Sequence, residues 1–440
     1  MIKGSILKKL NTNMPDIIKR IFAKYIRRRV ILNKYFMRKI EELNEYYHLN
    51  EAEKEELGKK QLKEILIYSY EKVPYYKGLF DKCKFNPYEL NSVSQMKCLP
   101  ILSKEKIIDN FNELKSVEDI NCYLASTGGS TGKPLKVLLD TKSIYEEKAF
   151  VYNYWSKLGY DYKKSQIITL RGVEFGNKIY KVNPIDNQLI LSPFKLNRET
   201  LPKYIKIINK FNPEYIHGYP SAIYNLCRLI NIENVKLKAR IKGIFFVSEN
   251  IDEIEKKYIE DTLGCKSLIF YGHSERATFA EQYDDGYRFN NLYGIVEFIP
   301  EKDKDHYSIV CTGLINRKMP LIRYKLDDVA IIKNGKIDIV GHWDKEMLIG
   351  KNDEKISMAS INFHSNVFEK IKAYQFEQYN KGEVILKIVE DNKLNENDIK
   401  QIKSALDLKL KGIIKFTIKI VDSIELTKRG KHKKILQHIV

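Results

Sequence analysis

Cysteine, proline and glycine are scarce in this chain of 440 residues, which contains 6, 12 and 22 of them. With so few prolines and glycines, long disordered tracts are not expected. No two cysteines form a Cys-x-x-Cys pair, and none has a closely spaced histidine partner. The cysteines therefore carry no metal-binding signature, and a disulfide framework is not expected in a chain of this length.

Long apolar runs are also missing. No uninterrupted run approaches the roughly 18 residues that a membrane-spanning helix needs. The N-terminus is basic, but the apolar core and small-residue cleavage site of a signal peptide do not follow it. We therefore expect a reduced, cytoplasmic protein.

Positive charge is concentrated at one end of the chain. Residues 1–40 contain twelve Lys or Arg against Asp16 alone, so they supply +11 of the net charge of +19. Within this segment, apolar residues recur at helical spacing from Ile17 to Ile26, and basic residues such as Arg20 and Arg27 cover the opposite side. Two interpretations stay open: a basic helix that lies on an anionic membrane, or a helix docked on its own domain. No nucleic-acid-binding module is recognisable, so nucleic acid is not an expected partner.

The middle of the chain has the pattern of an α/β core. The chain is long for a single core, which favours two domains. From about 120 to 340, short apolar strands alternate with helical stretches. The expected helices include 204–209, 222–230 and 253–262.

The two flanks of this core have patterns of their own. A helix is expected from about Asn50, as N-cap, to Tyr70, and Pro74 is expected to end it in an extended stop. Near the C-terminus, 383–390 and 413–421 predict strands and 397–408 predicts a helix. The last hundred residues therefore predict a small separate α+β domain.

A glycine-rich loop lies between two predicted strands, Tyr123–Ala125 and Leu135–Leu139. Its three glycines let backbone N–H groups converge on an anion, while hydroxyls and lysines add donors and charge. The residues assigned to this loop are Ser126, Thr127, Gly128, Gly129, Ser130, Thr131, Gly132, Lys133 and Lys136. The loop predicts an anion site, with a ligand-free Gly/Ser hairpin as the alternative.

The spacing of this loop does not fit a Walker A motif. That motif requires glycine six positions before the lysine, followed by Ser or Thr. Here Thr127 stands six positions before Lys133, and Pro134 follows the lysine. A strand rather than a helix is also expected after the loop.

Further motifs follow the loop in an order that resembles the adenylate-forming superfamily. They are His217-Gly218-Tyr219-Pro220-Ser221, Tyr271-Gly272-His273-Ser274-Glu275-Arg276, Met319-Pro320-Leu321-Ile322-Arg323-Tyr324, Gly350-Lys351-Asn352 and Leu426-Thr427-Lys428-Arg429-Gly430-Lys431. Within the superfamily, the chain resembles the phenylacetate-CoA ligase branch, and most of all the CapK-like proteins associated with capsular polysaccharide biosynthesis. The resemblance runs from about residue 50 to the C-terminus.

This resemblance implies a fold and a division of the chain. The expected fold is α/β with the adenylate-forming (ANL-type) architecture, in which a small α+β C-terminal lid domain follows a large α/β N-terminal domain. The implied parts are a basic helical extension (1–48), a large ATP- and acyl-binding domain (49–340) and the lid (341–440).

The resemblance also implies roles for individual residues. The glycine loop would hold the β,γ-phosphates of ATP, Tyr271 would stack on adenine, and Glu275 would ligate Mg²⁺ and serve catalysis. Tyr219 and His273 would help to shape the acyl pocket, although a satisfied core or second-layer residue is the commoner outcome for a histidine. The implied ATP-binding set is Thr127, Gly128, Gly129, Ser130, Thr131, Gly132, Lys133, Ser248, Glu249, Tyr271, Gly272, Arg323 and Asp328.

Two parts of the pattern leave alternatives open. Asp328 stands at the place of the ribose-binding acid, but the usual Thr-Gly before it is Leu326-Asp327, so either acid is a candidate. Lys431 would be the catalytic lysine that neutralises charge at the α-phosphate, and a solvated basic tail is its alternative. Gly341-His342 also departs from the family, which commonly has arginine in place of His342.

The expected function is an ATP-dependent ligase that uses ATP and Mg²⁺ to activate a small-molecule carboxylic acid as an acyl-AMP. The acceptor would be an amine or hydroxyl of a sugar or glycan, with the enzyme at the inner face of the cell membrane. Coenzyme A, as in phenylacetate-CoA ligases, is the alternative acceptor. A nucleotide-binding scaffold without turnover is the alternative of another class.

Overall fold

The structure is a computed structural model, and it describes residues 23, 25–27, 29, 31–126, 135–171, 175, 177–249, 251, 253–340, 347–352, 354–357, 370–410, 412–426 and 432–439. The chain forms two compact units. Unit 1 comprises Met1–Lys164, Pro184–Asn187 and Ile269–Ile339, and unit 2 comprises Ser165–Asn183, Gln188–Leu268 and Val340–Val440. Because part of 49–340 groups with the C-terminal residues, the division at 48 and 340 stays a prediction.

The helices of unit 1 begin where capping residues predict. Asn50 caps α4, since its side chain accepts the Glu53 N–H at 3.0 Å while the Glu53 carboxylate accepts the Asn50 N–H at 2.8 Å. The extended stop expected around Pro74 is wrong beyond Val73, because proline serves as the first residue of a new helix. The helices and 3₁₀ turns of unit 1 are α3 (Lys34–Tyr46), α4 (Glu51–Lys72), α5 (Pro74–Lys82), η1 (Pro87–Glu89), η2 (Val93–Cys98), α6 (Lys104–Asp109), α7 (Thr141–Trp155), η3 (Ser156–Leu158) and η4 (Pro184–Asp186).

The N-terminal helices are docked on unit 1 as far as the structure describes them. Helix α3 packs against α7 and buries Phe36 and Leu43 completely. The Arg27 side chain is buried and donates to the Tyr162 carbonyl, whereas Tyr25 is 59% exposed. The prediction of an apolar face and an opposite basic face is therefore wrong at these two positions. Arg27 can be buried because its guanidinium donates to a backbone carbonyl of the same unit. Residues 1–22 lie outside the described residues.

Antiparallel strands complete unit 1. Strands β11, β12, β13 and β14 form a four-stranded sheet in that order. Strand β9 pairs with β8 and with β10, and β1 pairs with β2. The strands are β1 (Cys122–Ser126), β2 (Lys136–Asp140), β8 (Ser267–Gly272), β9 (Phe279–Tyr283), β10 (Gly286–Phe289), β11 (Gly294–Pro300), β12 (His306–Gly313), β13 (Tyr324–Lys333) and β14 (Lys336–Val340).

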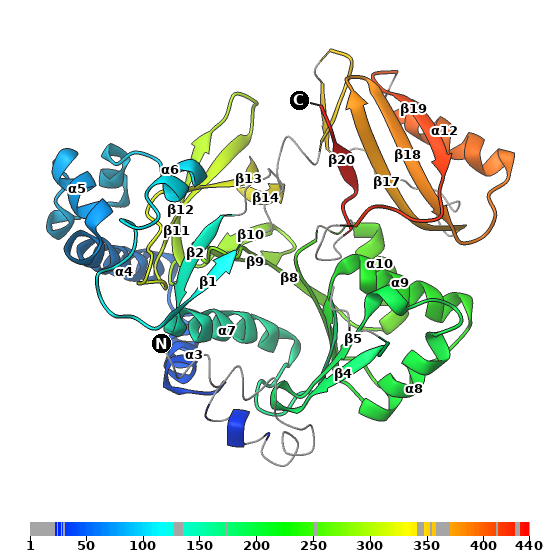
Figure 1. The fold of residues 1–440 in the computed structure, drawn as a ribbon, viewed down its shortest axis with the longest axis horizontal. Coiled ribbons are helices and arrows are strands. Elements are labelled where there is room, and N and C mark those ends of the chain that lie inside the picture. Colours follow the sequence, from blue (N-terminus) through cyan, green and yellow to red (C-terminus); the bar gives the residue numbers. More distant parts are fainter. Residues whose placement is uncertain are drawn as a thin grey trace. The chain divides into compact units, whose positions relative to one another are not determined.

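A parallel sheet forms the centre of unit 2, with strand order β7-β6-β3-β5-β4. Figure 1 labels β5 and β4, the last two strands in this order. All of its pairs are parallel except β4 with β5, and β3, β6 and β7 are buried throughout, as their unbroken apolar runs predict. Gly218 is required here, since a Cβ at this position would lie 2.2 Å from the Leu170 carbonyl oxygen. The strands are β3 (Ile167–Leu170), β4 (Tyr180–Asn183), β5 (Gln188–Leu191), β6 (Tyr215–Gly218) and β7 (Gly243–Phe246). A 3₁₀ turn, η5 (Pro193–Lys195), follows β5.

The expected helices of the α/β core are confirmed. Helices α8 (Leu201–Phe211), α9 (Pro220–Ile232) and α10 (Glu253–Leu263) contain the three predicted stretches. The core is thus α/β, as predicted.

The C-terminal residues of unit 2 form the predicted small α+β structure. Its four-stranded sheet has the order β19-β18-β17-β20, and α12 packs on it through Ile402 and Leu406, against Phe376 and Leu386. The predicted strand 383–390 coincides with β18. The elements are β15 (Met347–Ile349), β16 (Lys355–Ser357), β17 (Ile371–Asn380), β18 (Glu383–Glu390), α12 (Glu396–Leu410), β19 (Lys415–Ile420) and β20 (Ile435–Gln437).

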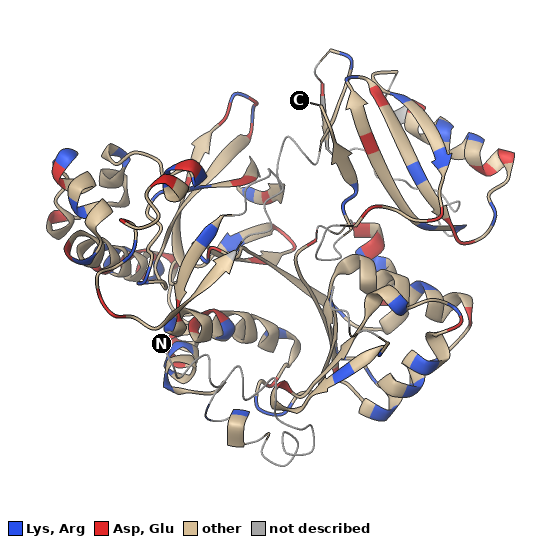
Figure 2. Cartoon of the chain, viewed as in Figure 1, with Lys and Arg blue, Asp and Glu red and all other residues tan. Residues whose placement is uncertain are grey.

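Charge is spread over the described elements. Figure 2 shows Lys and Arg interspersed with Asp and Glu along most of the helices and strands, which is consistent with an excess of positive charge concentrated near the N-terminus. Among the described residues, no helix is long and apolar enough to cross a bilayer.

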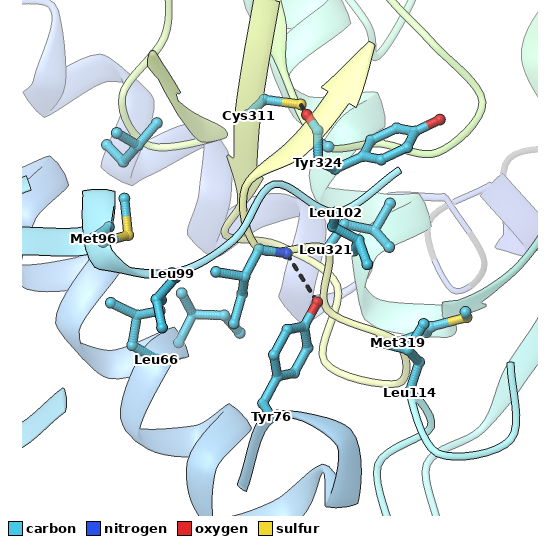
Figure 3. Packing of buried hydrophobic residues seen from close by; sticks show 14 of the residues in the cluster. Leu66, Tyr76, Met96, Leu99, Leu102, Leu114, Cys311, Met319, Leu321 and Tyr324 are labelled. Atoms are coloured by element: carbon cyan, nitrogen blue, oxygen red, sulfur yellow. Dashed lines mark hydrogen bonds between the residues drawn. The ribbon is translucent and has the colours of Figure 1, made fainter. Parts of the chain in front are cut away.

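The Tyr76 hydroxyl lies in the main core of unit 1. This side chain is only 1% exposed and lies among leucines and methionines from several segments (Figure 3). Its oxygen donates to the Pro320 carbonyl and accepts the Ile322 N–H, both at 3.0 Å. Helix α5 is thereby fixed to the segment that leads into β13.

Replacing Tyr76 by phenylalanine should destabilise the fold. The substitution Tyr76→Phe keeps the ring but leaves a buried N–H and a buried carbonyl without their partner, which costs about 1–3 kcal/mol. The free energy of unfolding in urea measures this loss. Tyr88→Phe is the matched control, since its exposed hydroxyl bonds only to Glu71, and we expect a change within about 0.5 kcal/mol. Equal effects of the two substitutions would contradict this role of Tyr76.

Candidate active site

The glycine loop is held by a regular strand pair. Strands β1 and β2 pair from Cys122 with Asp140 up to Ser126 with Lys136. The Asp140 carboxylate caps α7 through the Ser143 N–H at 2.6 Å and also accepts the Arg317 N–H at 2.7 Å. The strand predicted after the loop is confirmed, which agrees with the rejection of a Walker A motif. The loop residues themselves, 127–134, lie outside the described residues.

Two of the predicted nucleotide-binding residues are in contact. Tyr271, near the end of β8, donates its hydroxyl to the Asp328 carboxylate at 2.7 Å. Burial, and then the nearby Asp328 carboxylate, raise the pKa of Tyr271, so the hydroxyl remains protonated and acts as the donor. The pair places one aromatic ring and one carboxylate together, and their roles toward adenine and ribose stay predictions.

A bulge in β13 separates the two candidate ribose acids. Ser308 pairs with Val329, and Val310 pairs with Lys325. An advance of two residues along β12 therefore corresponds to four residues along β13, which is a β-bulge. Within the bulged stretch, Asp327 forms an ion pair with Lys104, whereas Asp328 receives the Tyr271 hydroxyl. The two acids therefore have different partners, and which of them binds ribose stays a prediction.

Glu275 lies in the turn after β8, and its side chain is almost completely buried. One carboxylate oxygen accepts the Tyr324 hydroxyl and the other accepts the His273 Nδ1–H, both at 3.1 Å. Burial by itself would raise the pKa of Glu275, but the His273 bond, a backbone N–H and the Tyr324 hydroxyl together lower it. Glu275 is therefore ionised at neutral pH.

This single carboxylate fits the way in which proteins bind Mg²⁺ on nucleotides. Magnesium usually takes one or two protein carboxylates, and phosphates and water supply the remaining ligands. Among the described residues, no group of three or more His, Cys, Asp or Glu side chains is placed to hold a metal. The role of Glu275 as a Mg²⁺ ligand stays a prediction.

Arg276 anchors the turn that carries Glu275. It has a left-handed backbone conformation (φ +55°), and its guanidinium forms an ion pair with Glu147 of α7 at 2.5 Å. The guanidinium also lies 5.9 Å from the centre of the Tyr123 ring in β1. The turn, α7 and the base of the glycine loop are thus linked. Sequence reasoning gave Arg276 and Glu147 no role, because 129 residues separate them and no pattern marks the pair.

Arg323 has structural contacts. It is buried and makes a two-bond ion pair with Glu297, at 2.9 and 3.0 Å, and its remaining nitrogen donates to the Lys97 and Leu99 carbonyls. These bonds join β11 to the segment before α6. A contact between Arg323 and ATP stays a prediction, and these bonds do not support it.

In unit 2, the predicted residues cluster at the ends of parallel strands. Tyr219 is buried and begins α9, directly after His217-Gly218 of β6, and burial holds the pKa of His217 well below its usual value. Ser248, after β7, has a left-handed conformation (φ +65°). Ligands of open α/β sheets bind at such carboxyl ends.

Glu249 has contacts that the sequence did not indicate. One oxygen accepts the Ser221 N–H at 3.1 Å, and the other accepts the His432 N–H at 2.9 Å. His432 follows Lys431 directly in the chain, and Lys431 itself lies outside the described residues. The predicted nucleotide-binding residues of unit 1 thus group around Tyr271, Asp328 and Glu275, and Glu249 in unit 2 contacts the residue after the predicted catalytic lysine.

Comparison with known proteins shows which proteins this chain is similar to. No protein-family model matches the sequence. Protein CapK of Staphylococcus aureus is 24% identical over 405 residues, which cover 87% of this chain and 89% of that protein. The phenylacetate-coenzyme A ligase of Escherichia coli is 22% identical and matches 72% of this chain and 76% of its own length. The chain is thus similar to CapK and to phenylacetate-CoA ligases, which agrees with the resemblance of its motifs to that branch of the adenylate-forming enzymes.

Solved structures confirm the adenylate-forming fold. A 2-hydroxyisobutyryl-CoA ligase in complex with an acyl-AMP superimposes with a TM-score of 0.67 at 15% identity, covering 88% of this chain and 90% of that one. The anthranilate-CoA ligase AuaEII, in complex with anthranoyl-AMP, gives 0.52 at 13% identity over 72% and 66% of the two chains. This relative of the phenylacetate-CoA ligases therefore has the α/β adenylate-forming architecture. The comparisons support an enzyme of the adenylate-forming ligase class.

The two acids of the β13 bulge should differ in their effect on nucleotide binding. We expect Asp328→Asn to weaken ATP binding about 10- to 100-fold, because hydrogen bonds to a charged acceptor contribute about 1.5–3 kcal/mol. Asp327→Asn is the matched control, since its carboxylate pairs with Lys104, and we expect at most about a twofold change. Titration calorimetry with ATP and Mg²⁺ measures both. A larger effect of Asp327→Asn would identify Asp327 as the ribose ligand.

Proposed function

We propose that this chain is an ATP-dependent ligase that activates a carboxylic acid as an acyl-adenylate and passes the acyl group to an acceptor. The observation that carries the proposal is the group of side chains at the end of β8. There the ionised Glu275 carboxylate bonds to His273, and Tyr271, four residues earlier in the chain, bonds to Asp328. A carboxylate can bind the metal ion that accompanies ATP. An aromatic ring beside a second carboxylate can bind the adenine and the ribose. The similarity to CapK and to phenylacetate-coenzyme A ligases supports the same reaction class.

In the first step, a substrate carboxylate oxygen would attack the α-phosphorus of ATP, and the bond to the β-phosphate oxygen would break. Asp328 would accept the ribose hydroxyls, and Tyr271 would stack on adenine. Donors of the glycine loop, from Thr127 to Lys133, would receive the departing pyrophosphate charge. Glu275 would hold Mg²⁺, which neutralises phosphate charge when bound. Lys431 would contact the developing charge at the α-phosphate.

The acceptor we propose is an amine or hydroxyl of a sugar or glycan in surface polysaccharide biosynthesis. The resemblance to CapK-like proteins supports this choice, and CapK matches over more of the chain than the coenzyme A ligases do. The second candidate acceptor is coenzyme A. The phenylacetate-coenzyme A ligase relatives and the solved CoA ligases support it.

Exchange of labelled pyrophosphate into ATP, over a panel of carboxylic acids, tests the first step. We expect at least one acid to support exchange, and Lys431→Ala to slow it about 10²–10³-fold, the usual loss for one fixed group that stabilises transition-state charge. Glu275→Gln should reduce exchange and raise the Mg²⁺ concentration that exchange requires. Lys428→Ala, a neighbouring lysine of the same basic segment, is the control and should leave exchange unchanged.

The outcome separates the candidate functions. If ATP binds but no acid supports exchange, the chain is a nucleotide-binding scaffold and not a ligase. With an active acid, addition of coenzyme A that yields AMP and a thioester selects the coenzyme A reaction. AMP release that depends on an amino sugar, with no thioester formed, selects the glycan reaction.

We further propose that the basic N-terminal residues hold the enzyme at the inner face of an anionic membrane. Residues 1–22 contain Lys3, Lys8, Lys9, Lys19 and Arg20. A cation near such a surface contributes about 1 kcal/mol. A deletion that tests this role should end at residue 22. Arg27, Phe36 and Leu43 are buried in unit 1, so a longer deletion would damage the fold.

Deleting residues 1–22 should abolish binding to anionic membranes. We expect the full chain to sediment with vesicles that contain phosphatidylglycerol, and the shortened chain to remain in the supernatant. Vesicles of phosphatidylcholine alone are the control and should bind neither protein. Equal sedimentation of the two chains with anionic vesicles would rule out this role.

A further inference from the structure

A groove of about 400 Å³ lies in unit 1 between helix α3, the end of α7 and the turn after η3. Helices α3 and α7 pack against each other (Figure 1), and residues 159–163 line the groove beyond the end of α7. Small-molecule sites in proteins occupy about 300–1,000 Å³, so the groove has room for one small ligand. None of the described residues that line it belongs to the predicted nucleotide-binding set.

Three tyrosines line the groove, and buried contacts hold their rings in place. Tyr152 and Tyr160 are only 7% and 2% exposed, and their ring centres lie 5.3 Å apart. The Tyr162 ring stands edge-on to the buried Phe36 ring, with 5.1 Å between the ring centres. Tyrosine offers a large flat surface with few rotatable bonds, so rings that are already fixed can bind a ligand at a small cost in entropy.

Two side-chain amides line the same groove. Asn153 Nδ2 of α7 donates to Asn44 Oδ1 of α3 at 3.0 Å. Asn153 is only 9% exposed, whereas Asn44 is an exposed residue. Among the described residues, neither Asn153 Oδ1 nor Asn44 Nδ2 has a further hydrogen-bond partner. The pair therefore leaves one acceptor and one donor for a ligand.

The turn after η3 adds a hydroxyl and a carboxylate to the groove. Burial, and then the Asp161 carboxylate, raise the pKa of Tyr162, so its hydroxyl stays protonated. No described residue bonds to that hydroxyl. Asp161 accepts the Lys163 N–H at 2.8 Å and pairs with Lys164 at 3.4 Å, which holds the turn.

These groups together favour a neutral sugar over other small ligands. A sugar ring has C–H groups on its faces, which pack on aromatic rings, and hydroxyls at its edge, which both donate and accept. A phosphate would require cations, but Lys163 is the one cation among the described lining residues, and the Asp161 carboxylate would repel an anion. A wholly apolar ligand would leave the amides and the Tyr162 hydroxyl without partners.

We propose that this groove is a binding site for a neutral sugar ring, such as one hexose unit of a glycan. The Tyr162 ring packs on one face of the sugar, and the exposed Lys163 side chain, which now lies over that ring at 5.7 Å, moves aside. Asn44 Nδ2 donates to one sugar hydroxyl, and Asn153 Oδ1 accepts another. The inference goes beyond the proposed function, because this site involves neither ATP nor the activated acid.

Saturation-transfer NMR of the full-length protein tests the site in the absence of ATP and of any acid. The probes are the methyl glycosides of glucose, galactose, mannose and N-acetylglucosamine, each at about 10 mM, which suits a dissociation constant of about 1 mM. We expect transfer to at least one glycoside, and weaker transfer to glucose 1-phosphate. No transfer to any of the four, or stronger transfer to glucose 1-phosphate than to every glycoside, would overturn the proposal.

Substitutions locate the bound sugar. Asn44→Ala removes a donor at an exposed position, and Tyr162→Ala removes the ring and its hydroxyl, so we expect each to weaken binding of that sugar about tenfold. Glu45→Ala, the next residue of α3, and Tyr35→Ala, an exposed tyrosine outside the groove, are the matched controls and should change the affinity less than about twofold. Binding that both groove variants leave unchanged, or that a control weakens equally, would contradict the site.

If Tyr162→Ala proves unstable, Tyr162→Phe takes its place, because it keeps the contact with Phe36 and loses only the hydroxyl. We then expect a loss of affinity of about threefold, with Asn44→Ala as the deciding variant. Sugar binding is measured apart from pyrophosphate exchange. Exchange without sugar binding would therefore overturn this inference alone, and sugar binding without exchange would overturn only the proposed function.

Discussion

The guanidinium of Arg276 lies between the Glu147 carboxylate of α7 and the Tyr123 ring of β1. This cation joins three segments that are far apart in the chain: the turn after β8, a helix, and the stem of the glycine loop. A buried cation is retained only where its charge is balanced, so loss of Glu147 would release the turn rather than merely weaken one bond. Glu275, one residue away, depends on that turn for its place between His273 and Tyr324.

The bulge in β13 has the same kind of importance for Asp328 and Tyr271, two of the predicted nucleotide-binding residues. An uninterrupted strand would direct neighbouring side chains alternately to the two faces and pair every residue with β12. The extra residues break that pairing over Leu326–Asp328, and the two adjacent acids then receive different partners, Lys104 and Tyr271. The departure from the family at Leu326-Asp327 therefore coincides with a local irregularity that still supplies a carboxylate to Tyr271.

In unit 2, polar contacts organise the C-terminal end of the chain. The Gln375 amide donates to the Glu425 and Lys433 carbonyls, and the Glu249 carboxylate accepts the His432 N–H. Each bond uses a backbone N–H or carbonyl, so the contacts depend little on which side chains follow one another in the segment.

The amino-acid sequence by itself determined the α/β core, the capped helix at Asn50, the small α+β structure with strand 383–390, and the strand–loop–strand around the glycines. Periodicity, caps and turn residues act over a few positions, and a single sequence displays them directly. Only the tertiary structure decided that Arg27 is buried and that the neighbouring acids Asp327 and Asp328 contact different residues. It also decided two ion pairs, Arg323 with Glu297 and Arg276 with Glu147. Those outcomes depend on which groups, far apart in the chain, the fold brings within hydrogen-bond distance. Local sequence patterns extend over only a few residues, so they cannot predict such contacts.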